Sequence, residues 1–312
     1  MFHTLLNLRS SVLTPNRRET TFAFRGFQPR DERARTVLES AGNGFLDGFA
    51  MAAGTPSAAA AAARLQYLPA ATRGFGYEGA AMALAMLEVG RPRSGELRRF
   101  LTELAGSHVY LAYVGVGWAL ARLPRPLWRR PVAALADPVL DWLVLDGYGF
   151  HEAYFDTGRT VGAHRRPAGL SWQGHTGDGP VQSVFDQGVG RALWFVCGAD
   201  PRQLASTLDG FDRRRRPDLV AGLGLAATYA GGADAEVLAT VREIAGEHAA
   251  QLAQGAVFAA ETRARSGAVN PHTEAACQAL AGISVAEAVD LATTTRPTEA
   301  TTDGEVSYQV WR

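Results

Sequence analysis

Asp186 and Arg191 are a carboxylate and a guanidinium whose spacing could support acid–base chemistry. They lie five residues apart in the segment FDQGVGRALWF, which also holds two glycines. If both side chains point toward one pocket, Asp186 can act as a base and Arg191 can hold the oxyanion that forms. The alternative is an interhelical salt bridge.

His151 and Glu78 are two further candidates for catalysis. In WLVLDGYGFHEAYF, His151 and Glu152 stand where related segments of the chain have small or apolar residues. A polar pair on a packed helix face must find partners or line a cavity. Glu78 precedes a glycine at an expected helix N-terminus. The alternatives are a hydrogen-bonded core histidine and, for Glu78, a favourable interaction with the helix dipole.

Aromatic residues on the same predicted helices are candidates for the walls of a substrate site. They are Tyr77, Tyr148, Trp194 and Tyr229. Aromatic residues at helical spacing are also common in a protein core, which is the alternative interpretation.

We expect the four catalytic candidates to meet at the mouth of one cavity, covered by the loop over residues 157–184. In this arrangement His151 or Asp186 is the base, Arg191 holds the oxyanion and Glu78 orients the other groups. The sequence contains no motif for a metal or a nucleotide cofactor, so we expect no cofactor and no metal.

Glycines at regular intervals reveal an internal repeat. Seven segments share a glycine that begins a stretch of small residues with helical periodicity, 31 to 41 residues apart, at Gly48, Gly79, Gly117, Gly149, Gly190, Gly224 and Gly255. Alanine is frequent two and four positions after the glycine. Such an interval accommodates two helices and their turns. Chance matches in an alanine-rich chain are the alternative.

The sequence between the glycines predicts a partner helix in most repeats. The partner helices are expected over residues 31–38, 57–68, 95–104, 137–145, 201–208 and 233–244. We therefore predict an all-α protein of helical hairpins, forming a curved solenoid or toroid around a cavity.

The repeat also suggests how the chain is organised. We expect an N-terminal segment over residues 1–30, a helical-repeat domain over residues 31–292 and a polar tail over residues 293–312. The loop over residues 157–184 is an insertion in the longest interval. In the tail, Tyr308, Val310 and Trp311 are candidates for docking.

The charged residues exclude several classes of enzyme. The chain has 312 residues, with 31 acidic residues, 31 arginines and no lysine, and a formal net charge of zero. Without lysine there is no Schiff-base, Walker-A or kinase lysine chemistry. Without a basic surplus we expect no nucleic-acid partner.

The cysteines and the apolar stretches suggest a compartment. Cys197 and Cys277 form no CxxC pair and no disulfide framework, which is typical of a reducing cytosol. No uninterrupted apolar stretch approaches the ~18 residues that a spanning helix needs. We expect a cytoplasmic protein that is not in a membrane.

Several long segments together resemble a known bacterial family. They are ETTFAFRGF, RGFGYEGAAMA, HVYLAYVGVGWALARLP, WLVLDGYGFHEAYF, DQGVGRALWFVCGADP, LVAGLGLAATYAGG, LAQGAVFAAETRARSG and PHTEAAC. The chain is similar over about residues 19–296 to a family labelled as a domain of unknown function, whose members are encoded in enediyne natural-product gene clusters. The resemblance carries over no catalytic residue, so the site residues rest on the reasoning above.

The resemblance implies a role in enediyne biosynthesis. One enzyme of that family, from anthraquinone-fused (tiancimycin-type) pathways, joins the anthraquinone and enediyne parts by an intramolecular carbon–carbon bond without a cofactor. We expect such an enzyme here, with a polycyclic enediyne or anthraquinone intermediate as its small-molecule partner. The alternative is a non-catalytic protein that binds, sequesters or scaffolds such an intermediate. Both a monomer and a homodimer are compatible with the sequence.

Overall fold

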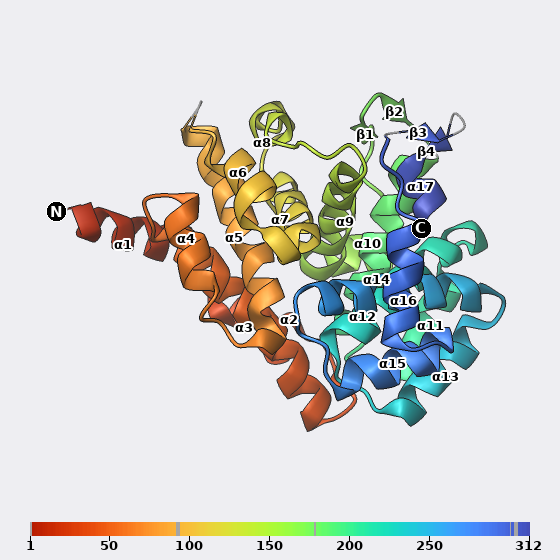
Figure 1. The fold of residues 1–312 in the computed structure, drawn as a ribbon. Helices are drawn as coiled ribbons and strands as arrows, with labels where there is room; N and C mark the ends of the chain where they lie inside the picture. The colour runs from red at the N-terminus through yellow and green to blue at the C-terminus, as the bar shows by residue number, and fades with distance from the viewer. Residues whose placement is uncertain (1, 92–93, 178, 300, 303–304) are drawn as a thin grey trace. The chain divides into compact units, whose positions relative to one another are not determined.

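The prediction of an all-α protein is confirmed by a computed structural model (Figure 1). The structure describes residues 2–91, 94–177, 179–299, 301–302 and 305–312. These residues form the helices α1 to α17 and two short antiparallel hairpins. In one hairpin β1 (Ser171–Trp172) pairs with β2 (His175–Thr176), and in the other β3 (Thr301–Thr302) pairs with β4 (Glu305–Val306).

The chain divides into two compact units. The first unit contains Met1–Gly26 and Glu39–Tyr148, and the second contains Phe27–Leu38 and Gly149–Arg312. The division falls within two helices, α3 (Glu32–Ala53) and α9 (Leu143–Phe155).

The first unit contains short helices around three long ones. Besides its parts of α3 and α9, it holds α1 (Phe2–Leu13), α2 (Phe22–Arg25), α4 (Ala58–Leu65), α5 (Ala70–Gly90), α6 (Glu96–Arg99), α7 (Val109–Arg122) and α8 (Arg129–Ala133). The chain continues from α6 into a π-helical turn, Phe100–Leu104. Helices α5 and α7 are buried along most of their length, whereas α4 buries one face made of alanines and Leu65.

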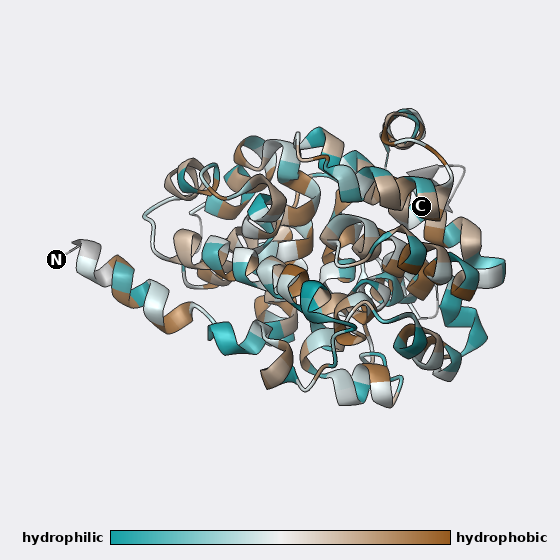
Figure 2. Ribbon diagram, turned by 90° about the horizontal axis from the view of Figure 1, so that it is seen from below, coloured by the Kyte–Doolittle hydropathy of each residue, from teal (hydrophilic) through white to brown (hydrophobic). Residues whose placement is uncertain are grey.

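The second unit follows the same plan. Its helices after α9 are α10 (Pro180–Val196), α11 (Pro201–Gly210), α12 (Arg216–Ala230), α13 (Ala235–Ala245), α14 (Ala249–Arg265), α15 (Pro271–Ala281), α16 (Val285–Thr294) and α17 (Ser307–Trp311). Helix α14 packs against both α12 and α16 (Figure 1). Helices α11 and α13 bury only one face, and hydrophobic and hydrophilic residues accordingly alternate along the helices in Figure 2.

The repeated glycines lie where helices cross in close contact. In the first unit, a Cβ on Gly48 would overlap with the carbonyl of Gly76 on α5, and a Cβ on Gly117 with that of Val144 on α9. In the second unit, a Cβ on Gly190 of α10 would overlap with the carbonyl of Leu219 on α12. Only glycine permits backbones to approach this closely.

The same contacts recur at the remaining members of the repeat. A Cβ on any of the other four glycines would likewise overlap with a backbone carbonyl of another helix. The pairs are Gly79 with Phe45, Gly149 with Phe185, Gly224 with Leu252 and Gly255 with Ala221. All seven predicted glycine segments are therefore helical, and their glycines mark helix crossings.

The prediction that each glycine begins its helix is wrong. Gly79 lies in the middle of α5 and Gly48 lies near the end of α3. Among the described residues, the glycine-bearing helices α5, α7, α10, α12 and α14 have no side-chain N-cap. The partner helices do begin at capping residues: Ser57 caps α4, Asp200 caps α11 and Asp234 caps α13. The glycines serve close packing, so each lies where its helix crosses another one and not where the helix starts.

The predicted partner helices are confirmed at α4, α6, α11 and α13, although their ends differ by a few residues. Two of them are not separate helices. Residues 31–38 belong to the continuous helix α3, and residues 137–145 form a single 3₁₀ turn, Leu140–Trp142, that runs into α9.

The predicted loop and tail contain more regular structure than expected. The range 157–184 holds a π-helical turn, Gly158–Gly162, the β1–β2 hairpin and the start of α10. In the range 293–312, the Tyr308 hydroxyl accepts a hydrogen bond from Gln187 at 2.9 Å, and the Trp311 indole donates to the carbonyl of Ala292 at 3.1 Å. Val310 is exposed. Residues 178, 300 and 303–304 of these two ranges lie outside the described residues.

Among the described residues, no single helix has the length and apolar character needed to cross a membrane, although two bent helix pairs meet the criteria of length and composition.

Candidate functional site

The predicted site residues belong to both units. Tyr77, Glu78 and Tyr148 lie in the first unit, and His151, Asp186, Arg191, Trp194 and Tyr229 lie in the second. All eight residues are buried. That they share one cavity stays a prediction.

Asp186 is fully buried on α10 and is held by two arginines. Arg215, at the start of α12, donates from Nε to Oδ2 at 2.9 Å and from Nη2 to Oδ1 at 2.7 Å. Arg166, from the segment before the β1–β2 hairpin, donates to the same two oxygens. Each carboxylate oxygen therefore accepts two charged hydrogen bonds.

This geometry makes Asp186 a link between three segments of the second unit. Arg215 also donates from Nη1 to the carbonyl of His164 at 2.6 Å, so the segment after α9 is fixed to α10 and α12. The partners of Asp186 are Arg215 and Arg166 and not Arg191. The arrangement favours the salt-bridge alternative for Asp186, because both carboxylate oxygens are already engaged in charged hydrogen bonds.

His151 lies beside a group of aromatic rings in the second unit. We call this group the aromatic cluster; it consists of Phe27, Phe150, Tyr154, Phe155 and Phe195. The rings meet at centroid distances of 5.0 to 6.4 Å, mostly edge to face. The His151 ring packs on Phe155 at 4.7 Å, and its Nδ1 lies 3.7 Å from Glu152 Oε1.

Arg191 contacts the same cluster from another helix. Its guanidinium carbon lies 5.2 Å from the ring centroid of Phe150, within the range of a cation–π interaction. His151 and Arg191 thus approach one aromatic surface from α9 and α10. Their exposed fractions are 8% and 6%, whereas Asp186 is at 0%, so a little of each side chain is still accessible.

Trp194 and Tyr229 have other roles in the second unit. Trp194 is fully buried and donates its indole hydrogen to the carbonyl of Gly231 at 2.8 Å, which makes it a core residue. The Tyr229 ring lies under the guanidinium of Arg263 at 3.9 Å. Trp194 therefore agrees with the alternative interpretation of the sequence, in which these aromatic residues belong to the protein core.

The three candidates in the first unit lie on two helices. Tyr77 stacks on His108 at 4.3 Å, and burial raises the pKa of its phenol. Tyr148 meets Trp128 edge to face at 5.5 Å. Glu78 lies in the middle of α5, not at a helix N-terminus as predicted, because the adjacent glycine serves a helix crossing.

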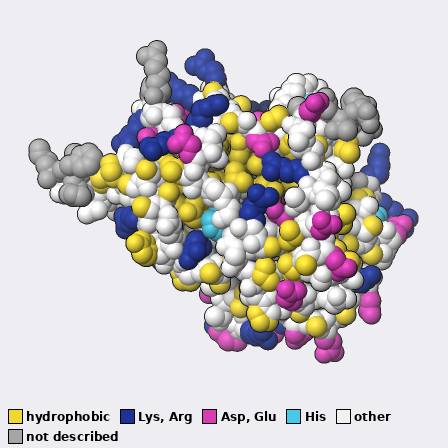
Figure 3. Space-filling view, viewed as in Figure 1, with side chains coloured by type: hydrophobic (Ala, Val, Ile, Leu, Met, Phe, Trp, Pro, Cys, Tyr) yellow, Lys and Arg dark blue, Asp and Glu magenta, His cyan; other side chains and the backbone are white. Residues whose placement is uncertain are grey.

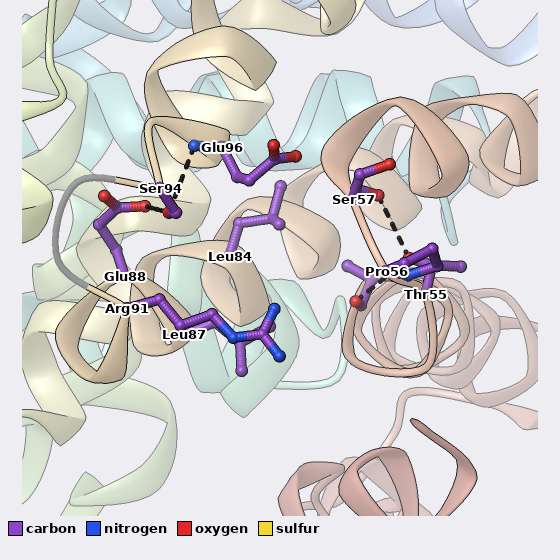
Figure 4. Close-up of a pocket in the computed structure, with 10 residues that line it drawn as sticks. Thr55, Pro56, Ser57, Leu84, Leu87, Glu88, Arg91, Ser94 and Glu96 are labelled. Atoms are coloured by element: carbon purple, nitrogen blue, oxygen red, sulfur yellow. Dashed lines mark hydrogen bonds between the residues drawn. The ribbon is translucent and has the colours of Figure 1, made fainter. Parts of the chain in front are cut away.

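A small pocket in the first unit, partly open to solvent, was not predicted from the sequence. It lies at the turn between α3 and α4 and at the end of α5, and it is lined by Ala52, Thr55, Pro56, Ser57, Leu84, Leu87, Glu88, Arg91, Ser94 and Glu96 (Figure 4). Its polar residues come from turns without repeated spacing. No motif in the sequence therefore pointed to it.

Charged side chains of both signs lie scattered among hydrophobic ones on the face shown in Figure 3. This distribution agrees with the balance of 31 acidic residues and 31 arginines in the sequence.

Comparison with known proteins adds one relationship. Residues 4–312 match the family model described as "Protein of unknown function (DUF1702)". No curated protein and no solved structure has significant similarity to the chain.

Proposed function

We propose that this chain, which belongs to the DUF1702 family, is a cofactor-free enzyme of enediyne biosynthesis that acts in the cytoplasm. Its proposed substrate is a polycyclic intermediate that contains an anthraquinone part and an enediyne part. The proposed reaction joins the two parts by an intramolecular carbon–carbon bond. The resemblance of residues 19–296 to proteins encoded in enediyne gene clusters supports this substrate class.

The observation that carries the proposal is the position of His151 and Arg191 at the aromatic cluster. A polycyclic aromatic substrate requires flat hydrophobic surfaces, which the rings of Phe150 and Phe155 could provide. Arg191 contacts the ring of Phe150, and His151 contacts that of Phe155. A base and a cation next to such surfaces are the groups that a cofactor-free coupling needs.

In the proposed step, His151 removes a proton from an acidic group of the anthraquinone part, such as a phenol. The negative charge is delocalised from the phenolate oxygen onto a ring carbon, whose electron pair forms the new bond to a carbonyl carbon of the enediyne part. The hydrogen on that ring carbon then moves to the phenolic oxygen, which restores the aromatic ring. The electron pair displaced from the carbonyl carbon moves to its oxygen, which Arg191 stabilises and which takes up the proton held by His151. The step is redox-neutral.

Two effects account for the acceleration of the coupling step in this proposal. Holding both reacting carbons in contact can contribute ~7–11 kcal/mol of the barrier. A positioned base contributes a further factor of ~10²–10⁴. The Glu152 carboxylate, 3.7 Å from Nδ1 of His151, supports this role because its charge favours the imidazolium that forms.

We also propose that the glycine-packed helices form a curved solenoid or toroid around the substrate. Its support is that the contacts follow the order of the chain, since Gly48 joins α3 to α5 and Gly190 joins α10 to α12. Small-angle scattering of the purified protein tests this shape, because an array without curvature would give a longer maximum dimension.

The second candidate function is non-catalytic binding of an enediyne intermediate. The four charged hydrogen bonds to Asp186 favour it, because they remove one of the two predicted bases from chemistry. Stacked helices suit binding as well as catalysis.

Metabolite profiling of a deletion strain separates the two functions. Accumulation of an uncoupled precursor supports the enzyme, whereas unchanged intermediates with a reduced titre or self-toxicity support the binding protein. Purified protein should then convert the precursor without any additive. A strict requirement for a metal or a nicotinamide would refute the cofactor-free reaction.

A further inference from the structure

A short segment of the second unit, Ser307–Arg312, lies against α10, α14 and α16; we call it the strap. Gln309 donates a hydrogen bond to the carbonyl of Pro180, at the start of α10, at 3.2 Å. The ring of Trp311 packs on that of Phe258 of α14, with a centroid distance of 4.8 Å. Figure 1 shows α17, the helical part of the strap, beside α16, whose backbone accepts a hydrogen bond from the Trp311 indole.

A connected network of polar side chains holds the strap to α10 and α12. Gln187 on α10 is 2% exposed; its amide nitrogen donates to the hydroxyl of Tyr308 at 2.9 Å, and its amide oxygen accepts from Nη1 of Arg312 at 3.0 Å. Arg312 also forms an ion pair with Asp218 in the first turn of α12. Its Nε donates to the side chain of Gln309 at 2.6 Å. Arg312 therefore joins α10, α12 and the strap.

The local structure of the strap depends on these contacts. Helix α17 has five residues, and each strand of the β3–β4 hairpin before it has two. Neither a helix nor an isolated hairpin of this size is stable by itself in water. The strap therefore stays ordered only while its side chains are docked on the helices beneath.

The shared residues of the network make this docking cooperative. Arg312 contacts both Asp218 and Gln187, and Gln187 in turn contacts Tyr308. Loss of the pair between Arg312 and Asp218 thus weakens the hold on Gln187 and, through it, on Tyr308. The groups that separate are a guanidinium, a carboxylate, an amide and a phenol, which water can solvate once the strap has left.

The helices beneath the strap are packed by contacts of their own. Helix α10 crosses α12 at Gly190, and α12 crosses α14 at Gly224; at both glycines a Cβ would overlap with a backbone carbonyl of the other helix. The overlapping carbonyls belong to Leu219 and Leu252, so neither crossing is made by a strap residue. A local opening of the strap therefore does not require these helices to separate.

We propose that Ser307–Arg312 is a releasable strap, which opens as one piece while α10, α12, α14 and α16 stay folded. When closed, it buries the amide of Gln187 and the carboxylate of Asp218 and lies on the ring of Phe258. When open, it exposes these groups to solvent. The strap is thus a conformational device that controls access to this face of the second unit, and it does not depend on the proposed function.

Native-state hydrogen exchange of the full chain, in low concentrations of urea, tests the proposal. The amides of the strap are followed in a peptide over residues 307–312, and those of α14 serve as the reference. In the wild type we expect the strap to open with a smaller urea dependence than α14, because a local opening exposes less surface. An equal opening free energy and an equal urea dependence would show that the strap opens only on global unfolding, and would overturn the proposal.

Two variants break the network from opposite sides. Arg312→Gln and Asp218→Asn should each accelerate exchange of the strap about tenfold or more, on the order of one charged hydrogen bond, and leave exchange of α14 unchanged. The double variant should open no more than Arg312→Gln alone, because both changes remove the same pair. Arg202→Gln is the matched control, since Arg202 is exposed on α11 of the same unit. Unchanged strap exchange in both variants, or an equal acceleration in α14, would contradict a releasable strap.

Discussion

His272 on α15 is bonded to the carbonyl oxygen of Ala227 on α12, with Nε2 2.8 Å from that oxygen. Its other nitrogen, Nδ1, lies 3.1 Å from the carbonyl oxygen of Ala233. A neutral imidazole has one N–H, so it can donate to only one of the two carbonyls. Burial nevertheless lowers the pKa of His272, and the charges of Arg263 and Arg33 add to this, while the two carbonyls act in the opposite direction.

This relationship predicts a pH dependence of stability. Because the pKa of His272 is lower in the folded than in the unfolded protein, the unfolded chain binds more protons in the interval between the two values. The stability contribution of neutral His272 is complete above about pH 6.5, the ordinary histidine value, and is lost as the pH falls toward the folded value. Urea unfolding of the wild type should show this decline between pH 7.5 and pH 5.

The variant His272→Gln should show a flatter profile over the same pH interval, because it cannot titrate. It should also be less stable by about 1 kcal/mol at pH 7.5, the net value of a hydrogen bond. A wild-type profile parallel to that of the variant would contradict the assignment to His272.

A methyl group at a helix crossing should separate two helices. The change Gly190→Ala places a Cβ against the carbonyl of Leu219 and should cost about 3 kcal/mol or more of unfolding free energy. Gly158→Ala is the matched control in the same unit, because no atom lies within 4 Å of the added Cβ, and it should change stability by less than ~1 kcal/mol. Urea unfolding measures both. Equal effects would show that the crossing tolerates a methyl group.

The glycine pattern explains why much of the fold could be predicted. Close backbone contact requires a glycine at each helix crossing, as it does for Gly117 against α9. The glycines therefore recur at regular intervals in the sequence. The ends of helices leave a weaker signal. Asp200 followed by Pro201 marked the start of α11 correctly. Residues 31–38 instead continue into α3 although Gly42 and Gly44 follow them, because these glycines lie inside the helix, where a Cβ would overlap with Thr20 or Thr72.

The two cysteines should be unreactive in the folded protein. Cys197 and Cys277 are both buried, and burial raises the pKa of each thiol to about 11. At pH 8 neither forms an appreciable amount of thiolate, which is the reactive form. A thiol reagent such as DTNB should therefore label neither cysteine in native protein and both after denaturation. Rapid labelling of a native cysteine would contradict the buried placement.

The candidate site was less predictable because its contacts join residues that are distant in sequence. The sequence could single out His151 as a candidate, since it replaces a small residue in the repeat. The partners of Asp186 could not, because Arg215 reaches it only through the crossing of α10 and α12. The pocket of the first unit is lined by polar residues of separate turns, such as Thr55, Arg91 and Ser94, which share no motif or spacing.

Asp186 should prove to be a structural residue. The change Asp186→Asn leaves buried Arg215 without its charged partner and should cost about 3–5 kcal/mol of unfolding free energy. Its activity per folded molecule should stay near that of the wild type. The melting temperature and the turnover, corrected for the folded fraction, decide the question. A stable variant that had lost turnover ~10²-fold would make Asp186 the base.

His151 should behave in the opposite way if it is the base at the aromatic cluster. The change His151→Gln should leave the melting temperature within a few degrees of the wild-type value and retain substrate binding, while kcat falls ~10²-fold or more, because the variant cannot accept a proton at the ring. The matched control is His248→Gln, since His248 lies at the start of α14, beside exposed Glu247. Single-turnover measurements with purified protein check kcat, and calorimetry checks binding. If His151→Gln melts several degrees lower but keeps its activity per folded molecule, His151 is a core histidine.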